Sequence, residues 1–167
     1  MKESKSFVSK EKIILYHGSC YTVEFPEVRK SRFTKDFSWG FYTTIVKAQA
    51  EKWSKRGNSK NVVSKYEYQE NSNLSILKFE SMTEDWLDFV IDCREGKIHG
   101  YDIVEGPMAD DKLFFFIDDY INGNISEETF WSYSKFKHPT HQLSFHSLEA
   151  LDCLKFIESY EVINNGV

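Results

Sequence analysis

The 167-residue sequence predicts a protein of the α+β class, in which short strands and interspersed helices surround one core. Segments of strand-like and of helical period both occur, but they do not alternate regularly as the elements of a doubly wound sheet do. Hydrophobic residues make up 41% of the chain and aromatic residues 16%, which is enough for one substantial core. We therefore expect a flexible segment over 1–12, one domain over 13–162 and a short tail over 163–167.

Four segments in the first half of the chain have the alternation or the short apolar runs of strands: Lys12–Tyr16, Gly40–Thr44, Val62–Tyr68 and Leu74–Phe79. The polar stretch Gln69–Asn73 is expected to join the last two as a hairpin. A helix is predicted over Ile45–Lys55, because the hydroxyls of Thr43 and Thr44 can accept hydrogen bonds from the N–H groups of its first turn.

A second helix is predicted after Ser81, which has Glu84 three residues later, as in a capping box. Its core-facing positions recur at helical intervals: Trp86, Phe89, Val90 and Cys93. A strand over Tyr101–Val104 and a third helix over Asp111–Ile121 follow, and the helix begins with carboxylates that favour the helix dipole.

In the last part of the chain, Ser126 is expected to cap a short helix that contains Phe130 and Trp131. Gln142–His146 alternates as a strand does. Ser147 is expected to begin a last helix with apolar residues at helical spacing: Leu148, Leu151, Leu154 and Ile157.

The charge of the chain and its apolar runs exclude several classes of protein. A formal net charge of -5 and a pI near 5.6 repel phosphate backbones, so nonspecific nucleic-acid binding is not expected. The first 12 residues lack the apolar region of a secretory signal. The longest strongly apolar run, Leu113–Ile117, is too short to cross a bilayer. We expect a cytoplasmic protein without a membrane span.

Neither the cysteines nor the histidines have the spacing of a metal site. Cys20, Cys93 and Cys153 are odd in number and far apart, which argues against a disulfide framework and a zinc knuckle. They are expected to be reduced and mostly buried. His138 and His141 lie on either side of a proline, so they cannot share one face of a regular helix. No metal is expected.

His17 is the first candidate site residue, because it follows an apolar strand and precedes a glycine in the stretch Leu15–Ser19. This order brings an imidazole to the end of a strand and leaves the neighbouring backbone open to a flat ligand. Two later segments, Asp36–Thr44 and Gln142–His146, add a tyrosine and a glutamine.

Together these motifs resemble a bacterial domain family of unknown function that is similar to a divergent branch of the ADP-ribosyltransferases. The segments that carry the resemblance cover most of the chain: Tyr16–Ser19, Ser31–Arg32, Asp36–Phe37, Gly40–Thr44, Gln49–Ala50, Gly106–Asp111 and Gln142–Phe145. The resemblance implies an ADP-ribosyltransferase-like split β-sheet core with flanking helices. Transferases of the diphtheria-toxin-like and poly-ADP-ribose-polymerase-like group carry a His, Tyr, Glu signature on three strands of this fold.

The resemblance also implies roles in binding NAD, which would be the substrate. His17 would hold a ribose hydroxyl, and Gly18 would offer backbone groups to the nicotinamide amide. Ser19 would also be among the NAD-binding residues. The ring of Tyr42 would stack on nicotinamide. Arg32 would pair with the diphosphate through its guanidinium, unless it is simply an exposed surface arginine.

Gln142 matches the third position of the signature, where glutamate is usual. A carboxylate there stabilises the oxocarbenium character that develops when the nicotinamide–ribose bond breaks, and a neutral amide contributes less. The glutamine leaves three interpretations open. The protein catalyses slower mono-ADP-ribosylation, another carboxylate such as Asp110 or Asp111 assists the reaction, or the NAD-shaped site has a different function. Asp110 and Asp111 have an alternative role as charges at a helix start.

The turn before Tyr42 also departs from the pattern. Ser38 stands where relatives of this type commonly have glycine, so the form of the turn is open. Asp36 and Phe37 are expected to shape this turn rather than to touch a ligand.

The function expected from these residues is transfer of ADP-ribose from NAD to an unknown acceptor, which is a protein, a nucleic acid or a small molecule. A toxin-like role would add an antitoxin partner. The alternatives are a catalytically silent module that binds a nucleotide or ADP-ribose, and an NAD glycohydrolase. A transferase of the same fold that uses NAD to take up an RNA phosphate is disfavoured by the acidic charge.

Overall fold

The computed structural model describes residues 12–30, 35–56, 60–109, 111–134 and 140–163. The strands of this part of the chain are β1 Ile13–Ser19, β2 Phe41–Thr43, β3 Val62–Tyr68, β4 Ile76–Lys78, β5 Ile103–Gly106, β6 Gln142–Phe145 and β7 Leu154–Glu161. The helices are α1 Lys47–Ser54, α2 Glu84–Arg94, α3 Asp111–Ile121, α4 Glu127–Ser134 and α5 Leu148–Leu151. The mixture of strands and helices without regular alternation confirms the α+β class.

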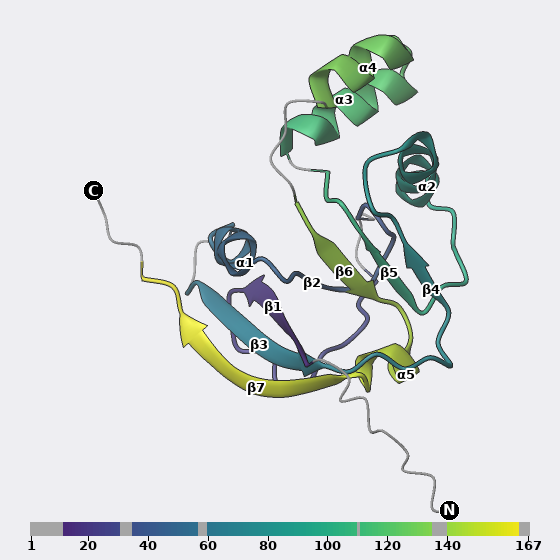
Figure 1. Cartoon of the computed structure of the whole chain (residues 1–167). Coiled ribbons are helices and arrows are strands. Elements are labelled where there is room, and N and C mark those ends of the chain that lie inside the picture. The colour runs from purple at the N-terminus through teal and green to yellow at the C-terminus, as the bar shows by residue number, and fades with distance from the viewer. Residues whose placement is uncertain (1–11, 31–34, 57–59, 110, 135–139, 164–167) are drawn as a thin grey trace, which may run out of the picture.

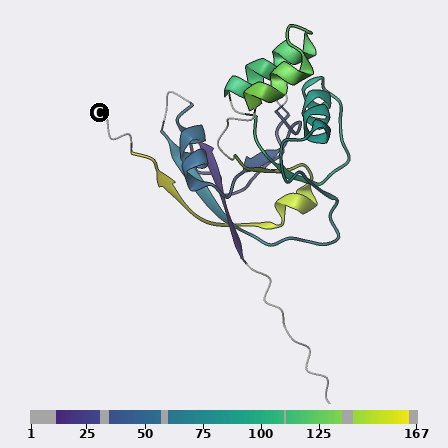
Figure 2. The same ribbon diagram turned by 45° about the horizontal axis from the view of Figure 1, so that its top comes forward.

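The strands form two sheets. The first has the order β1-β3-β7 and is antiparallel throughout, whereas the second has the order β2-β6-β5-β4 and contains one parallel pair, β4 and β5. Helix α1 packs on β1 and β3, and Figures 1 and 2 show α3 and α4 side by side at one end of the molecule. The first sheet therefore carries α1, while the other long helices lie with the second sheet.

An isolated β-bridge joins the two sheets. Tyr16 and Thr44 exchange backbone hydrogen bonds of 2.8 and 2.9 Å, from the Tyr16 N–H to the Thr44 carbonyl and from the Thr44 N–H to the Tyr16 carbonyl. Tyr16 is next to His17 in the chain, and Thr44 lies shortly after Tyr42. The bridge thus fixes β1 against the end of β2 and sets the distance between two predicted site residues.

Two clusters of buried side chains form the core. One joins both sheets and contains Leu15 and Phe145, and the other lies between the second sheet and α2, α3 and α4 and contains Trp86, Leu113 and Phe130. All five are fully buried. Burial of a large apolar side chain stabilises a fold by about 1.5–3 kcal/mol, so each cluster holds its elements firmly together.

The predicted last helix is wrong beyond its first turn. Ser147 does cap a helix, because its Oγ atom accepts a hydrogen bond of 3.2 Å from the N–H of Ala150, but α5 ends at Leu151. Leu154 and Ile157 belong to β7, which pairs with β3 along the edge that β1 leaves free. Pairing with this open edge outweighs the helical spacing of the leucines.

The predicted hairpin over Gln69–Asn73 is also wrong. Strand β3 is paired on both sides, with β1 and with β7, so it has no edge to offer to the next strand. The chain instead crosses to the second sheet, where β4 pairs in parallel with β5.

Two of the predicted helix caps differ as well. The N-cap of α2 is Thr83 rather than Ser81, and its Oγ1 atom accepts a hydrogen bond of 3.3 Å from the N–H of Trp86. Helix α1 begins only at Lys47, and its N-cap residue, Val46, has no capping side chain. The Thr44 Oγ1 atom accepts a hydrogen bond of 3.0 Å from the N–H of Val46, just before the helix, whereas the Thr43 hydroxyl donates to the carbonyl of Leu143. The predicted cap at Ser126 is confirmed by a 3.2 Å hydrogen bond from the N–H of Thr129, the third residue after it.

The cysteines are free in the described part of the chain, as expected, but only Cys93 is buried, whereas Cys20 is exposed and Cys153 is partly buried. Among the described helices, none combines the length and the apolar character that a bilayer crossing needs.

Candidate functional site

Four of the predicted site residues line one cavity of about 400 Å³: His17, Gly18, Tyr42 and Gln142. We call it the Gln142 cavity. It is bounded by residues of β1, β2 and β6 and of α1, α2 and α3, and its other lining residues are Lys35, Asp36, Trp53, Arg56, Arg94, Met108, Ala109 and Phe114. Strands far apart in sequence therefore bring an imidazole, a phenol and an amide to one place.

His17 is held as a neutral imidazole with a defined tautomer. Its Nδ1 atom lies 2.7 Å from the carbonyl oxygen of Tyr42, which has no proton to give, so Nδ1 carries the hydrogen and donates. The ring stacks on Phe41 at 4.4 Å between centroids. Burial lowers the pKa of His17 to about 4. At neutral pH the Nε2 atom therefore carries no proton and can accept a hydrogen bond from a ligand hydroxyl.

We expect the free energy of unfolding to fall as the pH decreases from 6.5 towards 4. Burial lowers the pKa of both His17 and His146 from 6.5 to about 4, so in this window the unfolded chain binds protons that the folded chain does not. Stability contributed by the two neutral rings is complete above pH 6.5. It is lost progressively until the folded rings are themselves protonated.

Urea unfolding at pH 7.5 and pH 5.0 measures this effect. The lowered pKa values of Asp102 and Glu105 act below their ordinary values of 3.8 and 4.5, so they add little at pH 5.0. The variant His17→Gln should show a smaller loss of stability between the two pH values than the wild type does. An unchanged loss in this variant would contradict the buried, neutral state of His17.

Tyr42 closes the turn that precedes it and also faces the cavity. Its hydroxyl donates to the carbonyl of Ser38 at 2.6 Å and accepts from the N–H of Phe37 at 3.0 Å. Burial and the nearby charge of Asp36 raise the pKa of Tyr42 well above its ordinary value of 10, so the hydroxyl keeps its proton. The ring is therefore fixed in position at the wall of the cavity, with 5% of the residue exposed and the hydroxyl used inside the protein.

The backbone conformation of Ser38 defines the form of the turn before Tyr42. Ser38 has a φ angle of 72°, in the left-handed region that glycine adopts without strain. The Ser38 N–H donates to the carbonyl of Lys35 at 3.0 Å, and its own carbonyl accepts from Tyr42. The backbone of Ser38 thus has the conformation expected of a glycine, and the turn places Tyr42 at the cavity.

Two of the cationic residues that line the Gln142 cavity are Lys35 and Arg56. The Nζ atom of Lys35 lies 4.7 Å from the centroid of the Tyr42 ring, a cation–π distance. Burial and, next, the charge of Arg56 lower the pKa of Lys35. The charge of Arg56 thus disfavours the charged form of Lys35, and the nearby charge of Asp36 opposes this effect.

Gln142 is buried and held by its amide nitrogen. Its Nε2 atom donates to Asp36 Oδ2 at 3.1 Å and to the carbonyl of Pro107 at 3.2 Å. Only 3% of the residue is exposed. Its position at the start of β6 fixes the backbone, because Gln142 pairs with Gly106 of β5.

Asp36 joins several elements behind Gln142. Its Oδ1 atom accepts from Arg94 at 2.9 Å, and its Oδ2 atom accepts from the N–H of Ala109 at 2.8 Å in addition to the Gln142 amide. Arg94 is also 3.7 Å from Asp118 of α3 and lies over the ring of Phe114. The carboxylate expected only to shape a turn thus holds the turn, α2 and β6 together.

Gly18 and Ser19 do not have equal roles. Gly18 packs against α1 so closely that a Cβ atom would lie 2.0 Å from the carbonyl oxygen of Ala50. Ser19 is at the end of β1, where its hydroxyl donates to the carbonyl of Tyr21, and it is not among the residues that line the Gln142 cavity. The absence of a side chain at position 18 is therefore a requirement of helix packing as well as of cavity shape.

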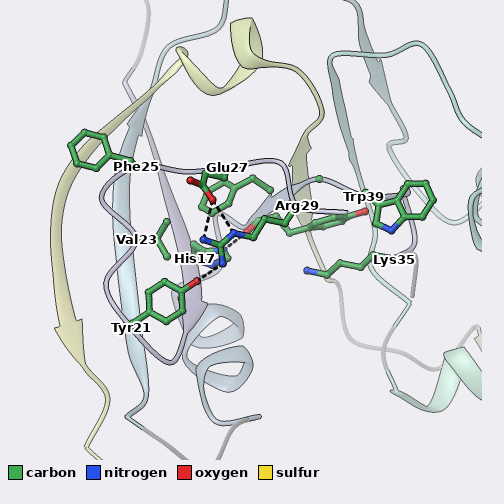
Figure 3. A pocket seen from close by; sticks show the side chains of 11 residues that line it. His17, Tyr21, Val23, Phe25, Glu27, Arg29, Lys35 and Trp39 are labelled. Atoms are coloured by element: carbon green, nitrogen blue, oxygen red, sulfur yellow. Dashed lines mark hydrogen bonds and ion pairs between the residues drawn. The ribbon is translucent and has the colours of Figure 1, made fainter. Parts of the chain in front are cut away.

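A second cavity, of about 270 Å³, lies beside the first and shares His17, Lys35 and Tyr42 with it. We call it the Trp39 cavity. Figure 3 shows Trp39 and Lys35 on one side of it and Tyr21 on the other. Its remaining lining residues are Val23, Phe25, Glu27, Arg29, Gly40 and Phe41.

The Trp39 cavity has a polar edge on the side away from Trp39. The guanidinium of Arg29 donates to Glu27 at 2.9 Å and to the hydroxyl of Tyr21 at 2.9 Å (Figure 3). The three side chains come from the segment that follows β1. An aromatic wall and a charged edge thus face each other across this cavity.

Several lining residues were not among the predicted site residues. Trp53 is on α1 and lines the same cavity as Tyr42. Lys35, Asp36 and Arg94 also line it. Trp53 was detectable in principle, because α1 follows Tyr42 closely in the chain and a helix starting there must pass the end of β1.

Some predictions lie outside the described residues. Arg32 and Asp110 are among these, as is His138, and the side chain of Asp111 is not described. Within the described ranges no group of three or more histidine, cysteine or carboxylate side chains has the arrangement of a metal site.

Comparison with known proteins assigns the chain to a family through a match to a family model. No curated protein and no solved structure matches it. A family model, described as "Protein of unknown function (DUF3990)", matches residues 13–156. This range includes both cavities and the residues that link them. The chain therefore belongs to the DUF3990 family of proteins of unknown function.

Proposed function

We propose that this protein binds NAD in the Gln142 and Trp39 cavities and transfers its ADP-ribose part to an acceptor. The observation that carries the proposal is the meeting of His17, Tyr42 and Gln142 at one cavity. The resemblance assigns these residues to the three positions of the transferase signature, with glutamine in place of glutamate at the third. The two-sheet α+β arrangement, with β1 and β2 joined beside His17, supports an ADP-ribosyltransferase-like core.

The chemistry of the lining supports a dinucleotide as the ligand. Tyr42 and Trp53 offer aromatic rings to a nicotinamide, and Lys35 and Arg56 offer positive charge to a diphosphate. The adjoining Trp39 cavity offers a further aromatic wall to the second base. Because Lys35 lines both cavities, its ammonium is suited to contact a diphosphate that joins the two halves of a dinucleotide.

The proposed reaction breaks the bond between C1′ of the ribose and the nicotinamide nitrogen. The bonding electrons leave with nicotinamide, and the ribose develops oxocarbenium character. A nucleophilic atom of the acceptor then forms a bond to C1′ and loses its proton. His17 Nε2 and the Gln142 side chain are suited to hold ribose hydroxyls during this step, which orients the sugar.

A neutral Gln142 suits a slow transferase rather than a fast one. The carboxylate that contacts it, Asp36, accepts hydrogen bonds from Arg94, from the N–H of Ala109 and from Gln142 itself, so its oxygens are occupied within the protein. We therefore propose mono-ADP-ribosylation and not the growth of a polymer. Two alternatives retain the same site, namely an NAD glycohydrolase, in which water is the acceptor, and a module that binds a nucleotide without cleaving it.

Incubation with NAD labelled separately in nicotinamide and in adenine tests the proposal. Release of labelled nicotinamide together with adenine label on a protein, nucleic acid or small molecule is the expected result. Release without transfer identifies a glycohydrolase, and binding without release identifies a binding module. Absence of both binding and release contradicts the proposal.

Trp53→Ala should weaken NAD binding without unfolding the protein. The side chain is only partly buried, and loss of an aromatic stacking contact with a base costs on the order of 1–3 kcal/mol, or roughly 5- to 150-fold in affinity. Isothermal titration with NAD measures this. The matched control is Trp131→Ala on α4, which lines neither cavity and should leave affinity unchanged. Equal NAD affinity of Trp53→Ala and the wild type would remove Trp53 from the site.

A further inference from the structure

We infer that Asp36 is a positioning residue that turns the amide of Gln142 so that its carbonyl oxygen, and not its NH2 group, is offered to the ligand. Only one part of the inference rests on the proposed function: if the ligand is NAD, the group that faces this oxygen is a ribose hydroxyl. The orientation of the amide itself follows from the geometry of the described residues alone.

The partners of the Gln142 nitrogen fix its identity. A carboxylate oxygen and a peptide carbonyl oxygen accept hydrogen bonds and have no proton to donate. The side-chain atom 3.1 Å from Asp36 Oδ2 and 3.2 Å from the Pro107 carbonyl must therefore be the nitrogen, and both of its hydrogens are used. If the amide were rotated by 180°, an oxygen would face two oxygens.

Asp36 is itself held in place. Arg94 donates to one carboxylate oxygen and the N–H of Ala109 to the other, so the side chain cannot turn away from Gln142 without losing both bonds. Only 7% of Asp36 is exposed. The carboxylate also polarises the amide through the shared hydrogen bond, which makes the amide oxygen a better acceptor.

The consequence is a site that accepts a hydrogen bond where the usual signature has a charged acceptor. An amide oxygen takes the proton of a hydroxyl as a carboxylate oxygen does, but without a full charge. A negative charge at position 142 is disfavoured here, because it would lie about 3 Å from Asp36, and like charges at that separation cannot both be ionised readily. Asp36 therefore accounts for the presence of glutamine at the third position.

The test is the pH dependence of NAD binding by Gln142→Glu. At pH 8 two carboxylates face each other, and the substituted side chain turns away or is strained. At lower pH the two carboxyl groups share one proton, so a hydrogen bond between the substituted side chain and Asp36 is restored and a carbonyl oxygen again faces the ligand. The expected result is roughly tenfold weaker binding than wild type at pH 8, with most of the difference lost by pH 5.5.

Wild type measured at the same two pH values is the control for every other group that titrates near the ligand. The charged or titratable side chains that line the cavity with Gln142 are His17, Lys35, Asp36, Tyr42, Arg56 and Arg94. Binding by Gln142→Glu as tight as that of wild type at pH 8 would overturn the inference. The inference would also be overturned if the NAD affinity of Gln142→Glu were reduced by the same factor, relative to wild type, at both pH values.

A second measurement does not depend on NAD. In the wild type, the side-chain NH2 protons of Gln142 should exchange with solvent much more slowly than those of Gln69, which is exposed. The NMR signal is assigned by its loss in Gln142→Met. Exchange as fast as that of Gln69 would overturn the inference. Slow exchange in a protein that binds no NAD would leave the orientation of the amide standing and would instead contradict the proposed function.

Discussion

Gly18→Ala is expected to displace α1 and to cost about 3 kcal/mol of stability or more, the upper part of the range for overpacking a core. The added Cβ atom would lie 2.0 Å from the carbonyl oxygen of Ala50 and 2.8 Å from the amide nitrogen of Ser54. Both are backbone atoms of the helix, so no side chain can rotate to make room. The helix must move as a whole, and Trp53 moves with it.

Thermal unfolding measures the loss of stability caused by this substitution. NAD titration measures how the displacement of Trp53 changes the affinity for NAD. For a chain of this size, a loss of about 3 kcal/mol lowers Tm by roughly 6–12 °C. Gly100→Ala is the matched control, because a Cβ atom at Gly100 would meet nothing within 4 Å. If Gly18→Ala and Gly100→Ala have the same Tm, the close packing of β1 on α1 is wrong.

The local patterns of the sequence predicted some elements fully. The bounds of β3, Val62–Tyr68, and of α3, Asp111–Ile121, agree with those predicted from alternation and from a charged helix start. In these segments, the residues that decide the structure are neighbours in the chain. The segment after Ser147 differs, because its leucines fit a helix, but the open edge of β3, far away in sequence, makes most of it a strand.

The candidate site divides in the same way. The motifs around His17, Tyr42 and Gln142 carried enough information to predict that these residues meet, and they do line one cavity. The roles of Asp36 and Trp53 in the site were not predicted. The role of Asp36 depends on contacts 58 and 106 residues away, with Arg94 and Gln142, and no local pattern encodes such contacts.

Asp36→Asn should have the second large effect on stability. Asp36 and Arg94 are an almost fully buried ion pair, with 9% of each side chain exposed and 2.9 Å between the charged groups. Removing one partner of a buried pair leaves the other charge without compensation, which costs about 3–5 kcal/mol. The asparagine also cannot accept hydrogen bonds at both oxygen positions, so Ala109 or Arg94 loses its acceptor.

Urea unfolding at pH 7.5 measures this loss of stability. The control is an exposed ion pair near the end of α2, the helix that contains Arg94. Asp92 pairs with Lys97 at 2.5 Å, but both side chains are more than half exposed, so Asp92→Asn should change stability little. The double variant Asp36→Asn with Arg94→Met should lose less stability than the sum of the two single losses, because the buried pair is removed as a whole and the other acidic neighbour of Arg94, Asp118, is about half exposed to solvent. Additive losses would mean that Asp36 and Arg94 act independently, and the ion pair would then not be what joins α2 to the turn before Tyr42.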